Sequence, residues 1–304
     1  MTPRQLAMFG GLSAIWGGSY LLIKIALDGF EASMIVFGRV ALAALILYFA
    51  VHTRTDRRRA FRFMRFHPER VVVLGALSIA VPFMLISYGE TQISSGLTGI
   101  LVAPGPLFVA LFAPFLDPTE RVDRRGALAL LVGFAGVVLL VGADTVHDTG
   151  EFLGSVAVLG AACSYGLGAM YSKNHLSGAG VPPLVVSFFS CTAAAVMTLP
   201  FAAATIANNH PDLGEVAAVT SLGVIGTALA FVLYYSLIAE TGAGRASLVG
   251  YTIPPIALAY GAVLLGETVT VASVIGLVMI LLGVGFAGQR RPAEAEPGPP
   301  PEPA

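Results

Sequence analysis

Three charged residues, Lys24, Arg39 and Glu90, lie within or at the ends of long apolar runs. A charge inside an apolar helix is costly, so each one suggests a functional role. The planar guanidinium of Arg39 could bind a carboxylate with two hydrogen bonds, and Glu90 could bind and release a proton. Structural roles are the alternative: Lys24 could extend its amine to a membrane surface, and Arg39 could form a fixed pair.

The depth of these residues follows from the α-helical rise of 1.5 Å per residue. By this rise, Lys24 lies about 27 Å along the first apolar run, and Arg39 lies roughly 10 Å below the same face. Glu90 ends the third run on that face. We therefore expect an electrostatic gate at this face, with Lys24 and Glu90 in gating or coupling, or a carboxylate-binding site with Arg39 as its fork.

Seven aromatic residues at middle depth are the next candidates. Their polar atoms need partners away from lipid, and a cavity wall supplies them. Interfacial belts and hydrogen bonds between helices are the alternatives. With Arg39, the expected substrate-binding or cavity residues are Trp16, Tyr20, Tyr88, Tyr165, Tyr234, Tyr235 and Tyr251.

Prolines interrupt two of the apolar runs. Pro104 and Pro106 lie in the fourth run, and Pro254 and Pro255 lie in the ninth. Proline removes a helical hydrogen bond and bends the helix. We expect gating hinges at Pro106 and Pro254, with a static kink as the alternative.

The sequence lacks residues in the arrangement needed for metal binding, intramembrane catalysis, dinucleotide binding or ATP hydrolysis. Cys163, Cys191 and the five histidines show no metal-ligand spacing, so no metal or cofactor is expected. No paired acids or Ser/Lys and Ser/His sets occur at matching depth, which argues against an intramembrane enzyme. The GxGxxG pattern at 283–288 ends an apolar run rather than joining a strand to a helix. The only lysines are Lys24 and Lys173, so a Walker A lysine is absent and this chain alone cannot drive transport with ATP.

The composition explains why these residues stand out. The chain has 304 residues, of which 56% are apolar and 12% charged, with a mean hydropathy of +0.82. Soluble domains carry about 25% charged residues. A bilayer core needs roughly 20 apolar residues per helix. We therefore predict an all-α integral membrane protein with ten transmembrane helices, over residues 6–28, 32–52, 71–89, 95–116, 126–142, 151–172, 183–204, 215–238, 246–266 and 269–288.

The basic residues predict the orientation, since cytoplasmic connections carry an excess of Lys and Arg. One set of connections holds Arg4, the basic stretch 54–70, Arg121, Arg124, Arg125, Lys173, Arg245, Arg290 and Arg291. The opposite set holds Asp28, Glu31, Asp144, Asp148, Glu151, Asp212, Glu215 and Glu267. We expect a multi-pass protein of the plasma (inner) membrane with both termini in the cytoplasm.

The chain divides into halves that repeat. We expect five-helix repeats at 1–145 and 146–288 and a disordered, Pro-rich cytoplasmic tail at 289–304. Because each half has an odd number of helices, the repeats must be inverted in the membrane, as in many transporters. The spacing from Trp16 to Lys24 equals that from Tyr165 to Lys173, and the spacing from Glu120 to Gly136 equals that from Glu267 to Gly283. Between them, Tyr88 leads through a Gly/Ser-rich stretch to Pro106, and Tyr235 leads likewise to Pro254.

These residues resemble the drug/metabolite transporter superfamily, in its EamA-like branch. The resemblance covers about residues 6–288. It departs from the family at 116–120, where an added residue and a missing Gly leave the shape of this turn open. The matching residues are Trp16-Gly17, Lys24, Arg39, Pro106, Glu120-Arg121, the string 242–247, Pro254 and Gly266-Glu267.

The resemblance implies ten helices around a central cavity that opens to alternate sides. It implies that the third, fourth, eighth and ninth helices line the cavity, that the first, second, sixth and seventh act as gates, and that the fifth and tenth are peripheral. Relatives export amino acids or other metabolites, or carry nucleotide sugars and organic phosphates.

We therefore expect a secondary active transporter, an exporter of small metabolites such as amino acids or drugs, working by alternating access. Its energy would come from the substrate gradient or from protons, with Glu90 as the coupling carboxylate. The expected partners are a small-molecule substrate and membrane lipids, with no nucleic acid. A channel or facilitator is the alternative, and saturation of flux with substrate separates a carrier from a channel.

Overall fold

The structure is a computed structural model, and it describes residues 1–54, 62, 67–116, 124–144, 148–176 and 181–287. Over these ranges every regular element is a helix and no strand is present. Three sequence predictions fall outside the described residues: the tail 289–304, Glu120 with most of its turn, and most of the basic stretch 54–70.

The described part of the first half contains eight helical elements, and that of the second contains nine. The first eight are α1 (Pro3–Ala26), α2 (Ala32–Arg54), α4 (Pro68–Gly75), η1 (Ala76–Ala80), α5 (Val81–Gly89), α6 (Ser95–Val102), α7 (Gly105–Leu116) and α8 (Arg124–Asp144). The next nine are α9 (Thr149–Leu176), α10 (Pro183–Ala204), η2 (Ile206–Asn208), α11 (Leu213–Gly223), η3 (Val224–Leu229), α12 (Ala230–Thr241), α13 (Ala243–Ala246), α14 (Val249–Leu264) and α15 (Val271–Ala287).

Eight helical stretches in the described ranges are long and apolar enough to span a membrane. They confirm a multi-pass, all-helical membrane protein. The last two predicted runs form α14 and α15, which have 16 and 17 residues. These are shorter than the roughly 20 residues of a full span, so the count of ten spanning helices and the inversion of the repeats stay predictions.

Local signals set several helix ends. At α1, the Thr2 hydroxyl accepts from the Gln5 amide and the Gln5 side chain accepts from the Thr2 amide, a reciprocal cap that uses two unpaired donors. Asp212 and Glu215 form the same cap at α11. After α14, Gly266 has φ = 67°, a left-handed conformation that favours glycine and turns the chain towards α15.

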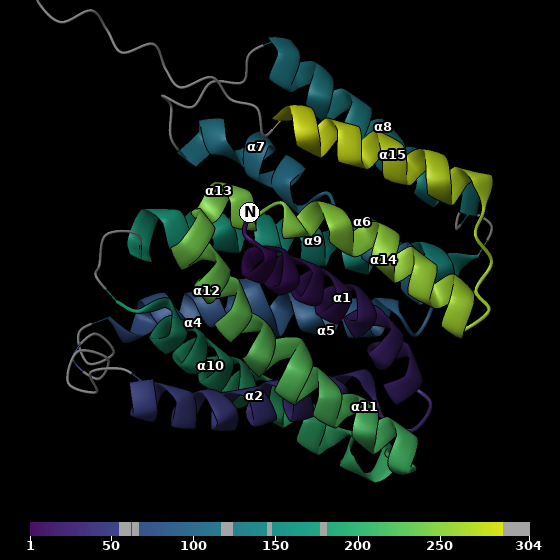
Figure 1. The fold of residues 1–304 in the computed structure, drawn as a ribbon. Coiled ribbons are helices and arrows are strands. Elements are labelled where there is room, and N and C mark those ends of the chain that lie inside the picture. Colours follow the sequence, from purple (N-terminus) through teal and green to yellow (C-terminus); the bar gives the residue numbers. More distant parts are fainter. Residues whose placement is uncertain (55–61, 63–66, 117–123, 145–147, 177–180, 288–304) are drawn as a thin grey trace, which may run out of the picture.

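The helices pack in layers (Figure 1). The pair α8 and α15 lies side by side at the top of the view, and α2 packs on α10 at the bottom. Between them, α1 packs on α14, and α9 packs on α5, α6 and α7. Residues far apart in sequence therefore meet throughout the bundle.

Glycines bring α8 and α15 together. A Cβ added at Gly283 would lie 2.6 Å from the Gly133 Cα and 2.7 Å from the Ala129 carbonyl oxygen. A Cβ at Gly136 would lie 2.9 Å from the Gly276 carbonyl oxygen. Without strong apolar attraction between helices in lipid, such close backbone contact supplies the packing energy.

Large apolar side chains face outward on the peripheral helices. Leu131 and Val138 on α8 are 67% and 70% exposed, and Val196 on α10 is 67% exposed. Apolar surface of this extent suits contact with lipid chains rather than water.

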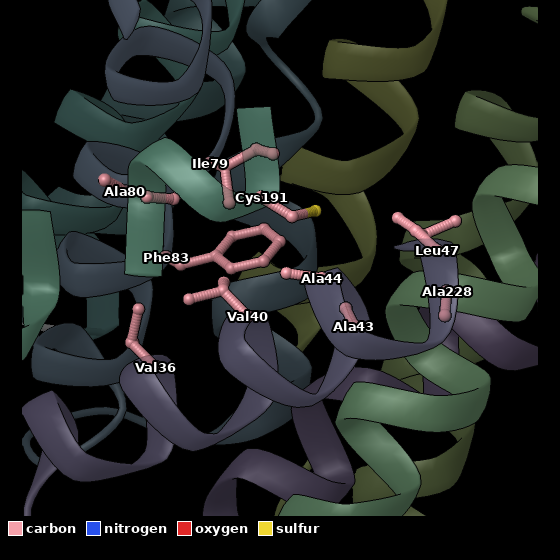
Figure 2. Close-up of a cluster of buried hydrophobic side chains, with 11 residues drawn as sticks. Val36, Val40, Ala43, Ala44, Leu47, Ile79, Ala80, Phe83, Cys191 and Ala228 are labelled. Atoms are coloured by element: carbon pink, nitrogen blue, oxygen red, sulfur yellow. The ribbon is translucent and has the colours of Figure 1, made fainter. Parts of the chain in front are cut away.

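A buried cluster joins the two halves. Val40 and Ala44 of α2 pack around Phe83 of α5, and Cys191 of α10 closes the cluster on the other side (Figure 2). Ala228 of η3 belongs to the same cluster. η1 and η3 are π-helical. The cluster holds α2 against both of them, which positions the site described next.

Candidate functional site

Two π-helical segments lie at corresponding places in the two halves. η1 follows Leu74-Gly75, and η3 follows Leu222-Gly223. A π-helical turn disturbs the regular hydrogen-bond ladder and frees backbone groups for other partners, and such turns are frequent at functional sites.

Arg39 of α2 hydrogen-bonds to η3. Its Nε donates to the Thr227 Oγ1 at 2.8 Å, and its Nη2 lies 3.5 Å from the Gly226 carbonyl oxygen. Its guanidinium carbon lies 4.0 Å from the centre of the Phe83 ring, a cation–π contact. Arg39 is 6% exposed, so these contacts replace water around most of its side chain.

Arg39 forms no ion pair with any described residue. A guanidinium has five N–H donors, and Thr227 and Gly226 use two of them. Tyr20 of α1 and Tyr165 of α9 lie close enough to interact with its charge. We call Tyr20, Arg39, Phe83, Tyr165 and Thr227 the Arg39 cluster.

The first π-helical segment is bound from the opposite half in a similar way. The Ser164 hydroxyl of α9 donates to the Leu77 carbonyl oxygen of η1 at 2.8 Å. A Cβ added at Gly168 would contact the Ser78 Oγ. Each π segment therefore contacts a side chain and a closely packed helix of the other half.

The turn from α5 to α6, residues 90–94, is held by Lys24 on one side. The Lys24 Nζ donates to the carbonyl oxygen of Glu90 at 2.7 Å and to that of Ile93 at 3.0 Å. These carbonyls follow the C-terminal end of α5, where a cation interacts favourably with the helix dipole.

Glu267, after α14, holds the other side of the turn. Its Oε1 accepts from the Ser95 amide at 2.8 Å, and its Oε2 accepts from the Gly96 amide at 2.9 Å and the Ser95 hydroxyl at 3.0 Å. An anion at the N-terminal end of α6 is favourable. The turn thus has a cation at one end and an anion at the other.

Glu90 is in this turn and is fully buried. Neither of its carboxyl oxygens has a hydrogen-bond partner within the described part of the chain. Glu90 lies one residue beyond the spanning stretch Pro68–Gly89. Burial raises the pKa of its carboxyl well above the ordinary value, and Glu267 adds to the rise, while Lys24 and Arg39 oppose it.

Three of the predicted aromatic residues form a row that begins near the middle of α1. The Trp16 and Tyr234 rings are 5.2 Å apart, and the Tyr234 and Tyr235 rings are 5.8 Å apart. Phe231 continues the row at 6.3 Å from Tyr235. All four side chains are only partly buried.

Four predicted residues lie apart from these groups. Tyr88 is 48% exposed on α5. The Tyr251 hydroxyl donates to the Val284 carbonyl oxygen at 3.1 Å and ties α14 to α15. Pro106 is exposed at the second position of α7, after a break in the helix at 103–104, whereas Pro254 is buried within the continuous helix α14.

The residues that sequence reasoning missed are partners rather than charges in apolar runs. Thr227 and Phe83 contact Arg39. Glu267 was noted for the orientation, the repeat and the family resemblance, but not as a contact of the α5–α6 turn. A usable signal existed: Leu74-Gly75, Ala80 and Phe83 recur with the same spacing in the second half. The matching residues there are Leu222-Gly223, Ala228 and Phe231.

A hollow of about 250 Å³ lies at the end of the bundle that holds the α5–α6 turn. It is lined by Leu27, Asp28, Gly29, Phe30, Glu31, Ala32, Thr91, Asn208 and His210. Over the described ranges, no three His, Cys, Asp or Glu side chains gather in a way that could hold a metal ion.

Comparison with known families gives a match over most of the chain. The model of the EamA-like transporter family matches residues 6–142 and again residues 152–288. The two matches correspond to the two halves whose spacing repeats.

Similar curated proteins are transporters by name. The chain is 25% identical to an uncharacterized transporter of Archaeoglobus fulgidus, over 91% of this chain and 95% of the relative. It is 24% identical to the probable terminal-alkyne amino-acid exporter of Streptantibioticus cattleyicolor, over 90% of each. It is 25% identical to the uncharacterized inner membrane transporter YedA of Escherichia coli, over 93% and 92%.

One crystal structure shares the fold. It superposes with a TM-score of 0.65 and 18% identity, over 94% of this chain and 97% of the other.

Proposed function

Because the chain belongs to the EamA-like transporter family, we propose that it is a secondary carrier that moves a small carboxylate-bearing metabolite, such as an amino acid, by alternating access. The observation that carries this proposal is the buried Arg39, which pairs with no carboxylate of the described residues. A buried unpaired cation is costly by several kcal/mol. A substrate carboxylate would supply the negative charge that Arg39 lacks. It would also accept hydrogen bonds from the guanidinium N–H groups that Thr227 and Gly226 do not use.

The substrate class and the outward direction are supported by one relative. The Streptantibioticus cattleyicolor protein is named as an exporter of an amino acid. An α-amino acid combines a carboxylate with a side chain, and the Arg39 cluster combines a guanidinium with the rings of Tyr20, Phe83 and Tyr165. The pairing of charge and aromatic surface fits such a solute.

The path would run from the Arg39 cluster to the partly buried row of Trp16, Tyr234 and Tyr235. Cys191 lies near both Arg39 and Tyr235, which connects the two groups. Tyr88 and Tyr251 fit this path less well, because Tyr88 points outward and Tyr251 is bonded to α15.

Inverted repeats at 1–145 and 146–288 would provide the alternating motion. The packing supports this arrangement, because several contacts that helices of the first half make with the second half have equivalent contacts with the two halves interchanged. The matching pairs are α1 on η3 with α9 on η1, α2 on α11 with α10 on α4, and α1 on α14 with α9 on α6 and α7. The pairs α2 with α10 and α8 with α15 each join equivalent helices.

The gates would use the interrupted helices. The break at 103–104 precedes Pro106 and separates α6 from α7, so these two segments can bend relative to each other. Pro254 would act within α14, where proline removes one hydrogen bond without ending the helix.

The basic connections support a cytoplasmic location for both termini and the tail 289–304. The name of the Escherichia coli relative supports an inner membrane location. The α5–α6 turn, with Glu90 and Lys24, would then face the exterior. Energy would come from the substrate gradient or from protons that bind at Glu90.

The first test is transport by the purified protein in liposomes, with labelled amino acids and with or without a pH gradient. We expect saturable flux that falls at least tenfold in Arg39→Gln, because the amide cannot replace a charged fork. Arg245→Gln, at an exposed arginine of α13, is the matched control and should transport normally.

Two results would count against the proposal. Equal flux in Arg39→Gln and the parent would make Arg39 a structural residue. Flux that rises linearly with substrate concentration would favour a channel, which does not saturate as a carrier does.

A further inference from the structure

Glu90 is the unsatisfied part of an otherwise well-bonded turn. Lys24 and Glu267 make five hydrogen bonds to residues 90–96, all to backbone groups or to the Ser95 hydroxyl. Between them, the Glu90 carboxyl is fully buried, and both of its oxygens are without a partner in the described part of the structure. The structure therefore brings a buried acid next to a cation that is bonded elsewhere.

An ionised carboxylate in this position would be strongly unfavourable. Burying an unpaired charge costs much more than burying a neutral polar group. The arrangement is therefore that of the protonated acid. Consistent with this, burial raises the pKa of the Glu90 carboxyl.

Lys24 has two possible acceptors at this place. Its ammonium now donates to the carbonyl oxygens of Glu90 and Ile93. It is also the cation that interacts most strongly with the Glu90 carboxyl. An ionised Glu90 would offer the stronger, charge-assisted hydrogen bond.

We propose that Glu90 is a proton-binding site that controls closure of the α5–α6 turn. With the proton bound, Lys24 holds the carbonyl oxygens of Glu90 and Ile93, and the turn is closed. When the proton leaves to water, the ammonium moves to the carboxylate and the turn is released. This inference rests on the proposed function for its purpose, because a turn released by proton loss would open one end of a carrier.

Water has a short route to this acid. Thr91, the next residue, is exposed and lines the hollow at this end of the bundle. A proton therefore need not cross the bundle to reach Glu90.

The other charged groups around Glu90 are Lys24 on α1, Arg39 on α2 and Glu267 after α14, with the Tyr20 phenol also nearby. In the proposal, the closed state binds the Glu90 proton more tightly than the released state. Low pH therefore favours closure of the turn, and rising pH favours its opening.

The test measures access to the turn without measuring transport. Thr98→Cys places a nearly isosteric thiol at a fully buried site in the first turn of α6. Gln92→Cys places one at an exposed site of the α5–α6 turn and corrects for the pH dependence of thiol reactivity. Labelling of each by a membrane-impermeant maleimide is followed by peptide mass spectrometry, with Cys163 and Cys191 left in place.

We expect the ratio of Thr98→Cys labelling to Gln92→Cys labelling to rise about tenfold between about pH 5 and about pH 9. Adding Glu90→Gln, which mimics the protonated acid, should keep the ratio low throughout. Adding Lys24→Met should keep it high throughout. Glu267→Gln should leave the rise with pH in place.

The direction in which the labelling ratio changes with pH is measured with Glu90 and Lys24 intact. The test therefore remains valid even if the Glu90→Gln variant does not fold. A ratio that is flat or falls with pH would overturn the proposal, as would a pH response unchanged by Glu90→Gln. Saturable, Arg39-dependent flux alongside such a result would leave the carrier function standing. A normal labelling response without flux would keep the proton site and reject the function.

Discussion

The Thr227 hydroxyl connects a buried charge to a distorted helix. It accepts from the Arg39 Nε at 2.8 Å and donates to the Leu222 carbonyl oxygen, five residues earlier, at 2.9 Å. An ordinary α-helical hydrogen bond joins residues four apart, whereas this hydroxyl bonds a carbonyl five residues earlier, just before the π-helical turn. One side chain therefore supports both the orientation of Arg39 and the wide turn of η3.

We expect Thr227→Val to destabilise the protein by about 1–3 kcal/mol, because valine keeps the shape but leaves a buried guanidinium donor without its partner and removes the hydrogen bond to the Leu222 carbonyl oxygen. Thermal unfolding in detergent measures this change. Thr192→Val on α10 is the control, because the Thr192 hydroxyl donates to the Phe188 carbonyl oxygen of its own helix. A loss no larger than that of the control would show that Arg39 does not depend on Thr227.

The sequence could identify the charges but not their partners. Lys24, Arg39 and Glu90 are conspicuous because charge is rare in apolar runs. The partners of Lys24 and Arg39 include backbone carbonyl oxygens, which every residue possesses, so no pattern of side chains indicates them. Glu267 lies far from the turn in sequence, and only the approach of α14 to α6 brings it there.

At the scale of elements, the wide turns in η1 and η3 meet small residues of the opposite half. A Cβ at Gly226 of η3 would lie 3.2 Å from the Ser19 Oγ of α1, and a Cβ at Gly168 of α9 would contact the Ser78 Oγ of η1. Serine and glycine exchange places between the two contacts. Both contacts permit close approach of helices, as small residues do in membrane proteins.

We expect Gly168→Ala to destabilise the protein by about 1–3 kcal/mol, because the new methyl group meets Ser78 in a packed contact. Adding Ser78→Ala should recover a large part of the loss, since it removes the atom that the methyl group meets. Thermal unfolding of the two single variants and the double variant measures the coupling. Additive losses would indicate that Gly168 is needed for another reason.

Hydropathy predicted the existence of the helices better than their internal form. Apolar runs indicate length and burial, but π-helical and α-helical turns have the same composition, so η1 and η3 could not be foreseen. The prolines were informative in only one half: the run with Pro104 and Pro106 breaks at 103–104, whereas α14 continues through Pro254 and Pro255. Packing against α1 and α6 keeps α14 helical over its length.

At the scale of the molecule, α8 and α15 form a peripheral pair. They contact each other more extensively than any other two elements, and Figure 1 shows them along one edge of the bundle. Neither contributes to the Arg39 cluster or to the α5–α6 turn. We infer a scaffold role, in which the pair supports α6, α7 and α14 without moving with the gates.

We expect Gly283→Ala to lower the free energy of unfolding by about 1–3 kcal/mol, because the added Cβ would overlap the α8 backbone. Gly142→Ala, on α8 with nothing within 4 Å of the added Cβ, should be neutral or stabilise by up to about 1 kcal/mol. Thermal unfolding compares the two. Transport per folded molecule should be unchanged in both, and a selective loss in Gly283→Ala would contradict a static scaffold.

The π-helical segments also determine where the chain tolerates a change of length. A π-helical turn holds about one residue more than an α-helical turn, so it absorbs an extra residue without changing the direction of the side chains beyond it. Deleting one residue within η1 or η3 would restore a regular helix and leave the later side chains on their original faces. The same deletion elsewhere in α5 or α12 would rotate the remainder of the helix by about 100°. These two wide turns are therefore the positions in their helices where one residue can be gained or lost without rotating the side chains that follow.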